Sequence, residues 1–302
     1  MQPPDKSPAL GRPTGTIVAW LARATWLVVA VLGGSAIGDA LADHSRGVQL
    51  TGTIGAWAGW GTVAVALVVP STVSLTIVRT IVPASAVAAV VAAIGGAGAT
   101  NSAVCIGSTV VTAALIGSAE VGQVFAQGSA YGHERRFVLR PPVAYLLPVV
   151  VTWCLLCAAA ISGPLLLAAR TWWAGVPVTV VALGGGWFLG RRFHVLSRRW
   201  LVLVPAGLVV HDPLVLAETF MMQKDSLESI GLALADTQAA DLTGPAAGHA
   251  VEVALRAMTT VVLAPTRAKP NGTALHVRSF LVTPTRPGRF LTAAAASGFP
   301  VG

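Results

Sequence analysis

The sequence is short of charged residues. Asp, Glu, Lys and Arg make up only 11% of its 302 residues, against about 25% in soluble domains. Arg79 is the only such residue from Gly47 to Ala119, and Arg170 is the only one from Pro141 to Gly190. A helix of about 20 apolar residues is long enough to cross the hydrocarbon core of a bilayer. These stretches therefore exclude an ordinary soluble domain and predict a polytopic membrane protein.

Cysteine is also scarce, which excludes a disulfide framework of the kind that staples small extracellular domains. The three cysteines, Cys105, Cys154 and Cys157, all lie in apolar stretches. Cys154 and Cys157 form a C-x-x-C pair, but a redox pair needs a thiolate, which apolar surroundings disfavour. We therefore expect these cysteines to pack as small hydrophobic residues.

The apolar stretches divide into six predicted spans. They cover Thr16–Ile37, Gly52–Val69, Ile81–Ala97, Ser102–Ser118, Val143–Ala169 and Trp172–Leu189. The boundary between the second and third spans is open, because several residues between Pro70 and Pro83 can break a helix. The third and fourth spans are joined so tightly, through Gly98–Asn101, that one re-entrant unit is the alternative for that pair.

Basic residues near the spans predict the orientation. With six spans the two termini share one side, which carries ten of the loop Lys and Arg residues, whereas the other side has only Arg46 and Arg170. The ten are Lys6, Arg12, Arg79, Arg135, Arg136, Arg140, Arg191, Arg192, Arg198 and Arg199. Because cytoplasmic loops are enriched in Lys and Arg, both termini are predicted to be cytoplasmic. The scarcity of Lys relative to Arg and the abundance of Ala, Val and Gly suggest a GC-rich bacterial genome, so the membrane is predicted to be a bacterial plasma membrane. Residues 1–15 are expected to be a disordered cytoplasmic N-terminus and residues 16–190 a helical transmembrane domain.

A cleaved signal peptide is the alternative for the first span. Ala40-Leu41-Ala42 fits a small-residue cleavage site, and the apolar part from Ala24 to Gly38 has about the length of a signal sequence core. Cleavage would leave five spans, and the charge bias would no longer match an even number. The sequence therefore favours a retained first span.

The composition changes at Arg191, where residues 191–302 begin and no run is long enough to cross a membrane. Branched runs in Arg199–Val204 and Leu208–His211 flank a Pro-Ala-Gly turn, which is typical of a hairpin. Further strands are predicted at Leu214–Met222, Val251–Leu255, Thr260–Leu263 and Ala274–Val282, followed by a short helix at Phe290–Ala296. Asp236–His249 has no clear period and is predicted to be a loop or a frayed helix. Residues 191–302 are thus expected to form a small, cytoplasmic, β-rich domain.

This layout resembles the bacterial pleckstrin-homology-like (PH-like) domains that follow membrane spans in many actinobacterial proteins. The resemblance is carried by the segments RRWLVLVPAGLVVHDP (Arg198–Pro213), QKDSLESIGLAL (Gln223–Leu234) and VRSFLVTPTRPGRFLTAAAA (Val277–Ala296). It covers roughly the last third of the chain and implies a fold of two sheets closed by one helix. It also implies a role in binding or assembly rather than a particular chemistry, and fold-level analogy is weak evidence of function.

The basic clusters are the one feature of the sequence that indicates a partner. Seven arginines are predicted to lie just cytoplasmic of their spans: Arg135, Arg136, Arg140, Arg191, Arg192, Arg198 and Arg199. Each such charge near an anionic leaflet contributes about 1 kcal/mol to membrane binding. They either only determine topology or also contact anionic lipid headgroups. Nucleic acid is not an expected partner, because no motif is present and aromatic residues do not interleave with the basic ones.

Other ionisable residues offer weaker candidates. His133-Glu134-Arg135-Arg136 lacks the second histidine of a zinc helix, since Phe137 stands there, so a solvated basic loop is predicted. Arg23 and Arg79 either extend to the membrane surface or pair with Glu120. Asp39, Asp43 and His44 are too few and too exposed to indicate a cation site.

No catalytic motif, metal site or cofactor site is predicted, and we do not expect an enzyme. The expected function is that of a membrane-anchored interaction or assembly module with an unidentified protein partner. The alternative is a small-solute transporter or channel, although no predicted span carries an acidic residue at mid-depth for ion coupling.

Overall fold

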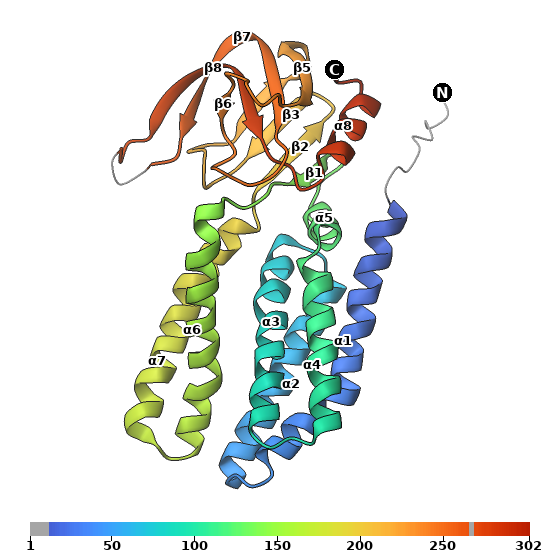
Figure 1. Cartoon of the computed structure of the whole chain (residues 1–302). Helices are drawn as coiled ribbons and strands as arrows, with labels where there is room; N and C mark the ends of the chain where they lie inside the picture. Colours follow the sequence, from blue (N-terminus) through green and yellow to red (C-terminus); the bar gives the residue numbers. More distant parts are fainter. Residues whose placement is uncertain (1–11, 266–268) are drawn as a thin grey trace.

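The structure is a computed structural model that describes residues 12–265 and 269–302. Its helices gather at one end of the molecule and its strands at the other (Figure 1). In the described part of the chain, six helices are long and apolar enough to cross a membrane. They are α1 (Arg12–Leu41), α2 (Arg46–Val68), α3 (Thr72–Ile94), α4 (Ala99–Gly117), α6 (Val143–Ala168) and α7 (Trp172–Leu196). Of the segment predicted to be disordered, residues 1–11 lie outside the described residues and residues 12–15 belong to α1.

Helices α1 to α4 form a bundle around a shared apolar core. The core includes Ala22, Val63, Leu75, Val78 and Ile116. Two tryptophans connect α1 to α2. Trp26 Nε1 donates to the Trp60 carbonyl and Trp60 Nε1 donates to the Trp26 carbonyl, both at 3.0 Å. A buried indole N–H needs such an acceptor, so this pair fixes the two helices without leaving a polar group unsatisfied.

The open boundary between the second and third spans falls at residues 69–71. Ser71 is the N-cap of α3, and its hydroxyl accepts a hydrogen bond from the Ser74 backbone N–H at 3.0 Å. The helix therefore begins at Thr72 rather than at Ile81, and Pro83 lies inside it. The two helices α3 and α4 are separate and each is of spanning length, which favours two spans over the re-entrant alternative.

Helices α6 and α7 form a separate hairpin beside this bundle (Figure 1). They approach closely at Gly163 and Gly175, since a Cβ on Gly163 would lie 2.7 Å from Thr179 Oγ1 and one on Gly175 would lie 2.8 Å from the Leu167 backbone N. Polar contacts to the bundle are few. Trp153 Nε1 donates to the Thr80 carbonyl at 3.0 Å, and a hydroxyl of α3 meets His194 Nδ1, also at 3.0 Å.

The β domain consists of two four-stranded sheets closed by helix α8 (Pro287–Ala296). The first sheet is antiparallel in the order β1 (Arg135–Val138), β2 (Trp200–Val204), β3 (Gly207–His211) and β4 (Phe220–Gln223). The second has the order β5 (Leu227–Leu232), β7 (Val251–Leu263), β8 (Thr273–Val282) and β6 (Ala240–Asp241), with β6 parallel to β8. Residues of both sheets and of α8 share one core, which includes Phe137, Leu201, Ile230, Phe280 and Phe290.

The predictions for three segments of the β domain are refined by the structure. The two strands expected at Val251–Leu255 and Thr260–Leu263 are one strand, β7, interrupted by a register shift between Ala254 and Thr259. The strand expected from Leu214 begins only at Phe220, because residues 213–215 form a turn and Leu216 makes only an isolated bridge to Leu263. The segment Asp236–His249 is mainly loop, with the short strand β6 inside it.

The prediction of a solvated loop at His133–Arg136 is wrong from Arg135 onward. Residues 135–138 form β1, which pairs with β2 in the register Arg135 to Leu203 and Val138 to Trp200. Burial of Phe137 explains the strand, since its ring meets Phe290 of α8 edge to face with the centroids 5.3 Å apart. The domain expected at 191–302 thus includes a strand from outside its bounds. Along the chain, the α6–α7 hairpin lies between β1 and β2, which are neighbours in the sheet.

The strand β1 is positioned by a short helix, α5 (Ala119–Gln127), which follows α4 directly. Ser118 caps this helix, accepting from the Val121 backbone N–H at 3.3 Å. Gln127 at its end both donates to the Glu134 carbonyl and accepts from the Arg136 backbone N–H, at 2.9 and 3.0 Å. Helix α5 therefore joins the bundle to the edge of the first sheet.

Candidate functional site

The candidate site is the region where the α6–α7 hairpin enters the β domain. We call it the junction. It comprises residues 139–142, which lead from β1 into α6, and residues 191–199, which form the end of α7 and its connection to β2. Five of the seven candidate arginines lie here: Arg140, Arg191, Arg192, Arg198 and Arg199. The structure gives them different surroundings, and these decide what each can bind.

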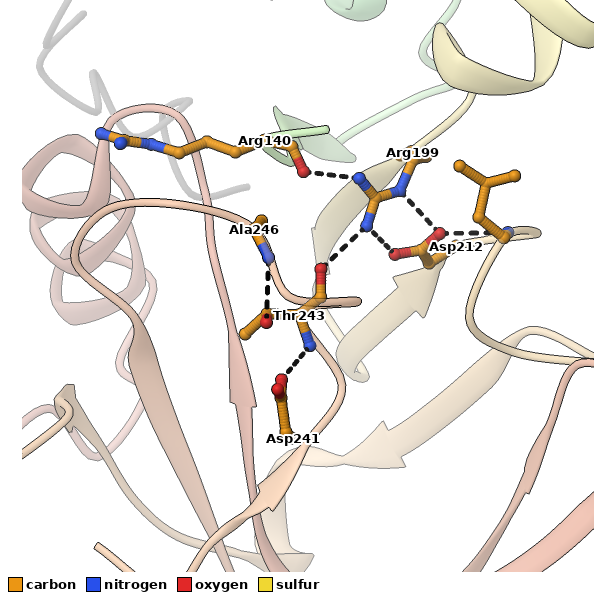
Figure 2. Close-up of polar contacts among 7 residues, drawn as sticks. Arg140, Arg199, Asp212, Asp241, Thr243 and Ala246 are labelled. Carbon is orange, nitrogen blue, oxygen red and sulfur yellow. Dashed lines mark hydrogen bonds and ion pairs between the residues drawn. The ribbon is translucent and has the colours of Figure 1, made fainter. Parts of the chain in front are cut away.

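Arg199 lies at the centre of a buried polar network (Figure 2). Its Nε and Nη2 donate to the two carboxylate oxygens of Asp212 at 2.7 and 2.6 Å, and both side chains are almost fully buried. The same guanidinium donates to the backbone carbonyls of Arg140 and Thr243. A guanidinium that is buried and bonded on all sides cannot reach a lipid headgroup. Arg199 is therefore a structural residue, contrary to its expected place among the membrane-surface arginines.

Arg140 is also occupied by the protein itself. Its Nη1 donates to the Ala247 carbonyl at 3.1 Å, and the guanidinium lies directly against Gly248. That glycine has a φ of 105° and no Cβ to block the contact. Nearby, Val143 at the start of α6 donates its backbone N–H to the Pro245 carbonyl at 3.2 Å. The loop 243–248 thus holds the first turn of α6 against the β domain.

Arg136 takes part in a stack on the outer face of the first sheet. It donates to Glu134 Oε1 from Nε at 3.1 Å and from Nη2 at 2.7 Å, and its guanidinium carbon lies 5.0 Å from the Trp200 ring centroid. His211 stacks on the same indole with centroids 5.1 Å apart. Burial, reinforced by the charge of Arg198, lowers the pKa of His211, an effect that Asp212 partly offsets. The stack therefore favours a neutral imidazole beside two arginines.

Arg191, Arg192 and Arg198 are exposed, and they are the candidate arginines best placed for a membrane surface. Arg191 lies over the Trp187 ring at 4.1 Å and Arg192 over the Phe188 ring at 5.3 Å. These rings are themselves exposed, as are Trp172 and Trp173 at the other end of the helix. From Trp173 to Trp187 the helix rises about 21 Å. Aromatic residues at both ends of an apolar helix are typical of membrane interfaces.

Of the two alternatives for Arg23 and Arg79, a pairing with Glu120 does not occur among the described residues. Glu120 instead forms an ion pair with Arg286, which precedes α8 in the β domain. Arg79 lies at the end of α4, with its Nε and Nη2 each 3.5 Å from the carbonyls of Ile116 and Ser118. Arg23 donates to the Leu67 carbonyl at 2.9 Å. All three side chains therefore connect elements of the fold.

The remaining candidates, the acidic residues near Asp39 and the cysteines, do not form a catalytic or metal-binding arrangement among the described residues. Asp39 accepts a hydrogen bond from Asn101 Nδ2 at 2.8 Å, which joins α1 to α4. Within residues 12–265 and 269–302, no group of three or more His, Cys, Asp or Glu residues is arranged to hold a metal ion. The cysteines in this part of the chain are free, and of the C-x-x-C pair Cys154 is exposed whereas Cys157 is buried.

Comparison with known proteins adds no family to this description. A scan against family models, a search of curated proteins and a search of solved structures each found no match. The functional argument therefore rests on the fold and the junction.

Proposed function

We propose that this chain is an integral protein of the bacterial plasma membrane whose β domain is PH-like and acts as a membrane-anchored interaction or assembly module. The observation that carries the proposal is the insertion of the α6–α7 hairpin between β1 and β2. When two membrane helices form the connection between two paired strands of a domain, that domain cannot leave the bilayer surface or rotate freely on it. Such an arrangement suits a module that presents one face at a fixed height and orientation.

The proposed orientation places the β domain and both termini in the cytoplasm. The start of α1 and the β domain lie at the same end of the helices (Figure 1), and Gly15 lies against α5, since a Cβ on it would be 3.2 Å from Val124 Cγ2. Six spans agree with termini on one side. The ten-to-two bias of Lys and Arg supports the cytoplasm as that side.

Anionic lipids are the proposed partners of the exposed junction arginines. Arg191, Arg192 and Arg198 follow the interfacial aromatic residues of α7, so their charges would lie at headgroup level. Each would contribute about 1 kcal/mol near an anionic leaflet. This attraction would add to the orientation that the hairpin imposes.

An unidentified protein is the proposed partner of the second sheet. Strands β5, β7 and β8 lie on the side of the β domain away from the helices (Figure 1). Leu232 and Leu234 at the end of β5 are both more than half exposed, and the Arg278–Glu228 ion pair crosses the same sheet. Exposed apolar residues rimmed by charge are typical of a protein contact. The face is described as a binding surface, and no enzymatic activity is proposed.

The proposal is tested by cross-linking and affinity capture of the intact protein from native membranes, with proteins and lipids identified by mass spectrometry. A protein partner captured by the wild type should be lost from Leu232→Glu/Leu234→Glu and kept by Met221→Glu, which changes an exposed apolar residue on β4 of the first sheet. Anionic lipid enrichment should fall when Arg191, Arg192 and Arg198 become Gln. Identical capture by all variants, at the level of an unrelated membrane protein, would refute the module.

A transporter or channel has weaker support. A groove of about 540 Å³ opens beside α2 and α3, and its walls are mainly apolar, including Gly61, Val65, Val69 and Ile77. The buried hydroxyls of Thr109 and Thr112 donate to carbonyls of their own helix at 2.7 and 2.8 Å. Neither threonine lines the groove, and its described lining carries no charged side chain that could hold an ion.

A further inference from the structure

A second concave feature lies on the β domain, away from the junction. A pocket of about 190 Å³ opens where the start of β1, the turn between β2 and β3 and the end of α8 meet. It is lined by His133, Arg135, Leu203, Val204, Pro205 and Ser297. Two of these side chains can carry positive charge, and no carboxylate is among the described residues that line it.

Arg135 has an unused guanidinium at this pocket. Its neighbour Glu134 is engaged elsewhere, because the Glu134 carboxylate accepts from Arg136 and from the Tyr131 backbone N–H, the latter at 2.6 Å. Arg135 contacts the Phe137 ring at 6.0 Å, but it forms no hydrogen bond or ion pair within the described part of the chain. Successive residues of a strand face opposite ways, so Arg136 and Arg135 serve opposite faces of β1. Five N–H donors of Arg135 are left for a ligand.

Lys224 supplies a third cation beside the same pocket. Its backbone N–H donates to the Ala206 carbonyl at 3.0 Å, and its Nζ donates to the Ser297 carbonyl at 2.8 Å. Lys224 therefore bridges two walls of the pocket, the β2–β3 turn and the end of α8. Gly298 permits this, since it has a φ of 72° and a Cβ there would lie 2.9 Å from Nζ. The ammonium also offsets the negative end of the α8 dipole, which would otherwise repel an anion.

The geometry points to a binding site for a phosphate monoester, held by Arg135, Lys224 and His133. These side chains come from β1, η1 (Lys224–Ser226) and the turn before β1, and together they can meet several oxygens of one dianion. Arginine binds phosphate through two parallel N–H bonds, and lysine acts as a point charge. The pocket is smaller than the 300–1,000 Å³ common for small-molecule sites. It therefore suits the phosphoryl group itself and a few attached atoms.

Two sources of this chemistry are open to the site. The turn before β1 is held to the bundle, because the Thr72 backbone N–H donates to Ser129 Oγ at 3.3 Å, so a lipid headgroup is within reach of the domain. A soluble phosphate monoester is the other source. The site shares none of its three cationic side chains with the exposed junction arginines. Its test is therefore independent of the test of the proposed function.

The soluble source is tested on the full chain in phosphatidylcholine nanodiscs. Inorganic phosphate and glycerol 3-phosphate are titrated by calorimetry at constant ionic strength, with chloride as the reference anion. Binding should saturate, and it should weaken at least tenfold in Arg135→Gln and in Lys224→Gln. Arg278→Gln, which removes an exposed arginine of the second sheet, should bind like the wild type. Arg135→Lys should recover part of the loss, which a purely structural role for the side chain would not predict.

The lipid source is tested by adding phosphatidic acid, a lipid phosphate monoester, to the nanodiscs. If the site takes a headgroup, phosphatidic acid will associate with the wild type, displace inorganic phosphate and fail to associate with Arg135→Gln. If the ligand is soluble, phosphate will bind equally in both kinds of nanodisc. Near-ultraviolet circular dichroism checks that the variants remain folded. Equal phosphate affinity in wild type and Arg135→Gln, or saturable binding in neither arm, would overturn the site.

Discussion

The bundle α1–α4 and the hairpin α6–α7 are alike in length and apolarity but differ in how they are held. Between 17 and 28% of each bundle span is buried inside the protein, against 6% for α6 and 11% for α7. The bundle is held by its own packing, as at Trp26 and Trp60. The hairpin has little packing to the bundle and is held at the end nearest the β domain by the strands it connects.

The comparison indicates that contacts within the β domain, and not packing against the other helices, hold α6 and α7 in place. Within a bilayer, lipid tails are as apolar as Leu, so exposed apolar surface drives no association between helices. The position of the hairpin therefore depends on the buried network around Arg199 and on the pairing of β1 with β2. Breaking those contacts should therefore destabilise the β domain and release the hairpin while the bundle α1–α4 stays folded.

The largest expected effect comes from removing β1. Residues 191–302 alone lack Phe137 and Leu139, which belong to the core of the β domain, so this fragment should aggregate or remain unfolded. Residues 128–141 joined to residues 198–302 by a short Gly-Ser linker should fold, because the Leu139 backbone N–H already lies 3.0 Å from the Arg199 carbonyl. Dispersion of amide signals in a ¹H–¹⁵N NMR spectrum distinguishes the two proteins. Equal dispersion would show that β1 is dispensable.

The next largest effect is expected at the buried ion pair. Arg199→Met leaves the Asp212 carboxylate buried without its partner, which costs about 3–5 kcal/mol. The free energy of unfolding of the β domain, measured by pulse proteolysis in detergent, should fall by that amount while the bundle persists. The exposed neighbour supplies the control, since Arg198→Met should change stability by no more than about 0.5 kcal/mol. Similar stability of the two variants would contradict the role of the network.

A smaller effect is expected from pH at the stack beside the junction. Because burial lowers the pKa of His211 below its ordinary value of 6.5, the unfolded chain takes up a proton that the folded domain resists. The contribution of His211 to stability is full above pH 6.5 and declines as the pH falls below it. Unfolding midpoints between about pH 7.5 and about pH 5.5 should therefore drop less in His211→Gln than in the wild type. The exposed His276→Gln is the control, and a slope unchanged by either substitution would exclude the stack as the cause.

The helical part was largely predictable because its signal is local. A run of about 20 apolar residues identifies a span without reference to any other segment, and six helices of spanning length are present in the described residues. The error at the start of α3 has a local cause as well. Pro83 and Arg79 suggested a break, whereas Ser71 supplies the cap that actually starts the helix.

The β domain was less predictable because its first strand is short and its partner is distant. Only four residues form β1, and nothing near them in the chain shows that Phe137 will be buried. The same limit applied to Arg199, which the pattern grouped with Arg198 as a surface charge. Its role depends on Asp212 and on carbonyls from two other segments. The Asp-Pro turn at residues 212–213 was visible, but the sequence did not show that its carboxylate points inward.

The insertion of α6 and α7 also sets an order for the synthesis of this protein. Arg140 and Arg199 are 59 residues apart, which a ribosome takes about 3–12 s to translate. During that interval β1 has left the ribosome but its neighbour β2 does not yet exist. In the proposed membrane protein, the first strand of the domain must therefore wait, with Phe137 uncovered, until α6 and α7 have been inserted into the bilayer. A delay in that insertion would leave the β domain incomplete, although the cause of the delay would lie outside the domain.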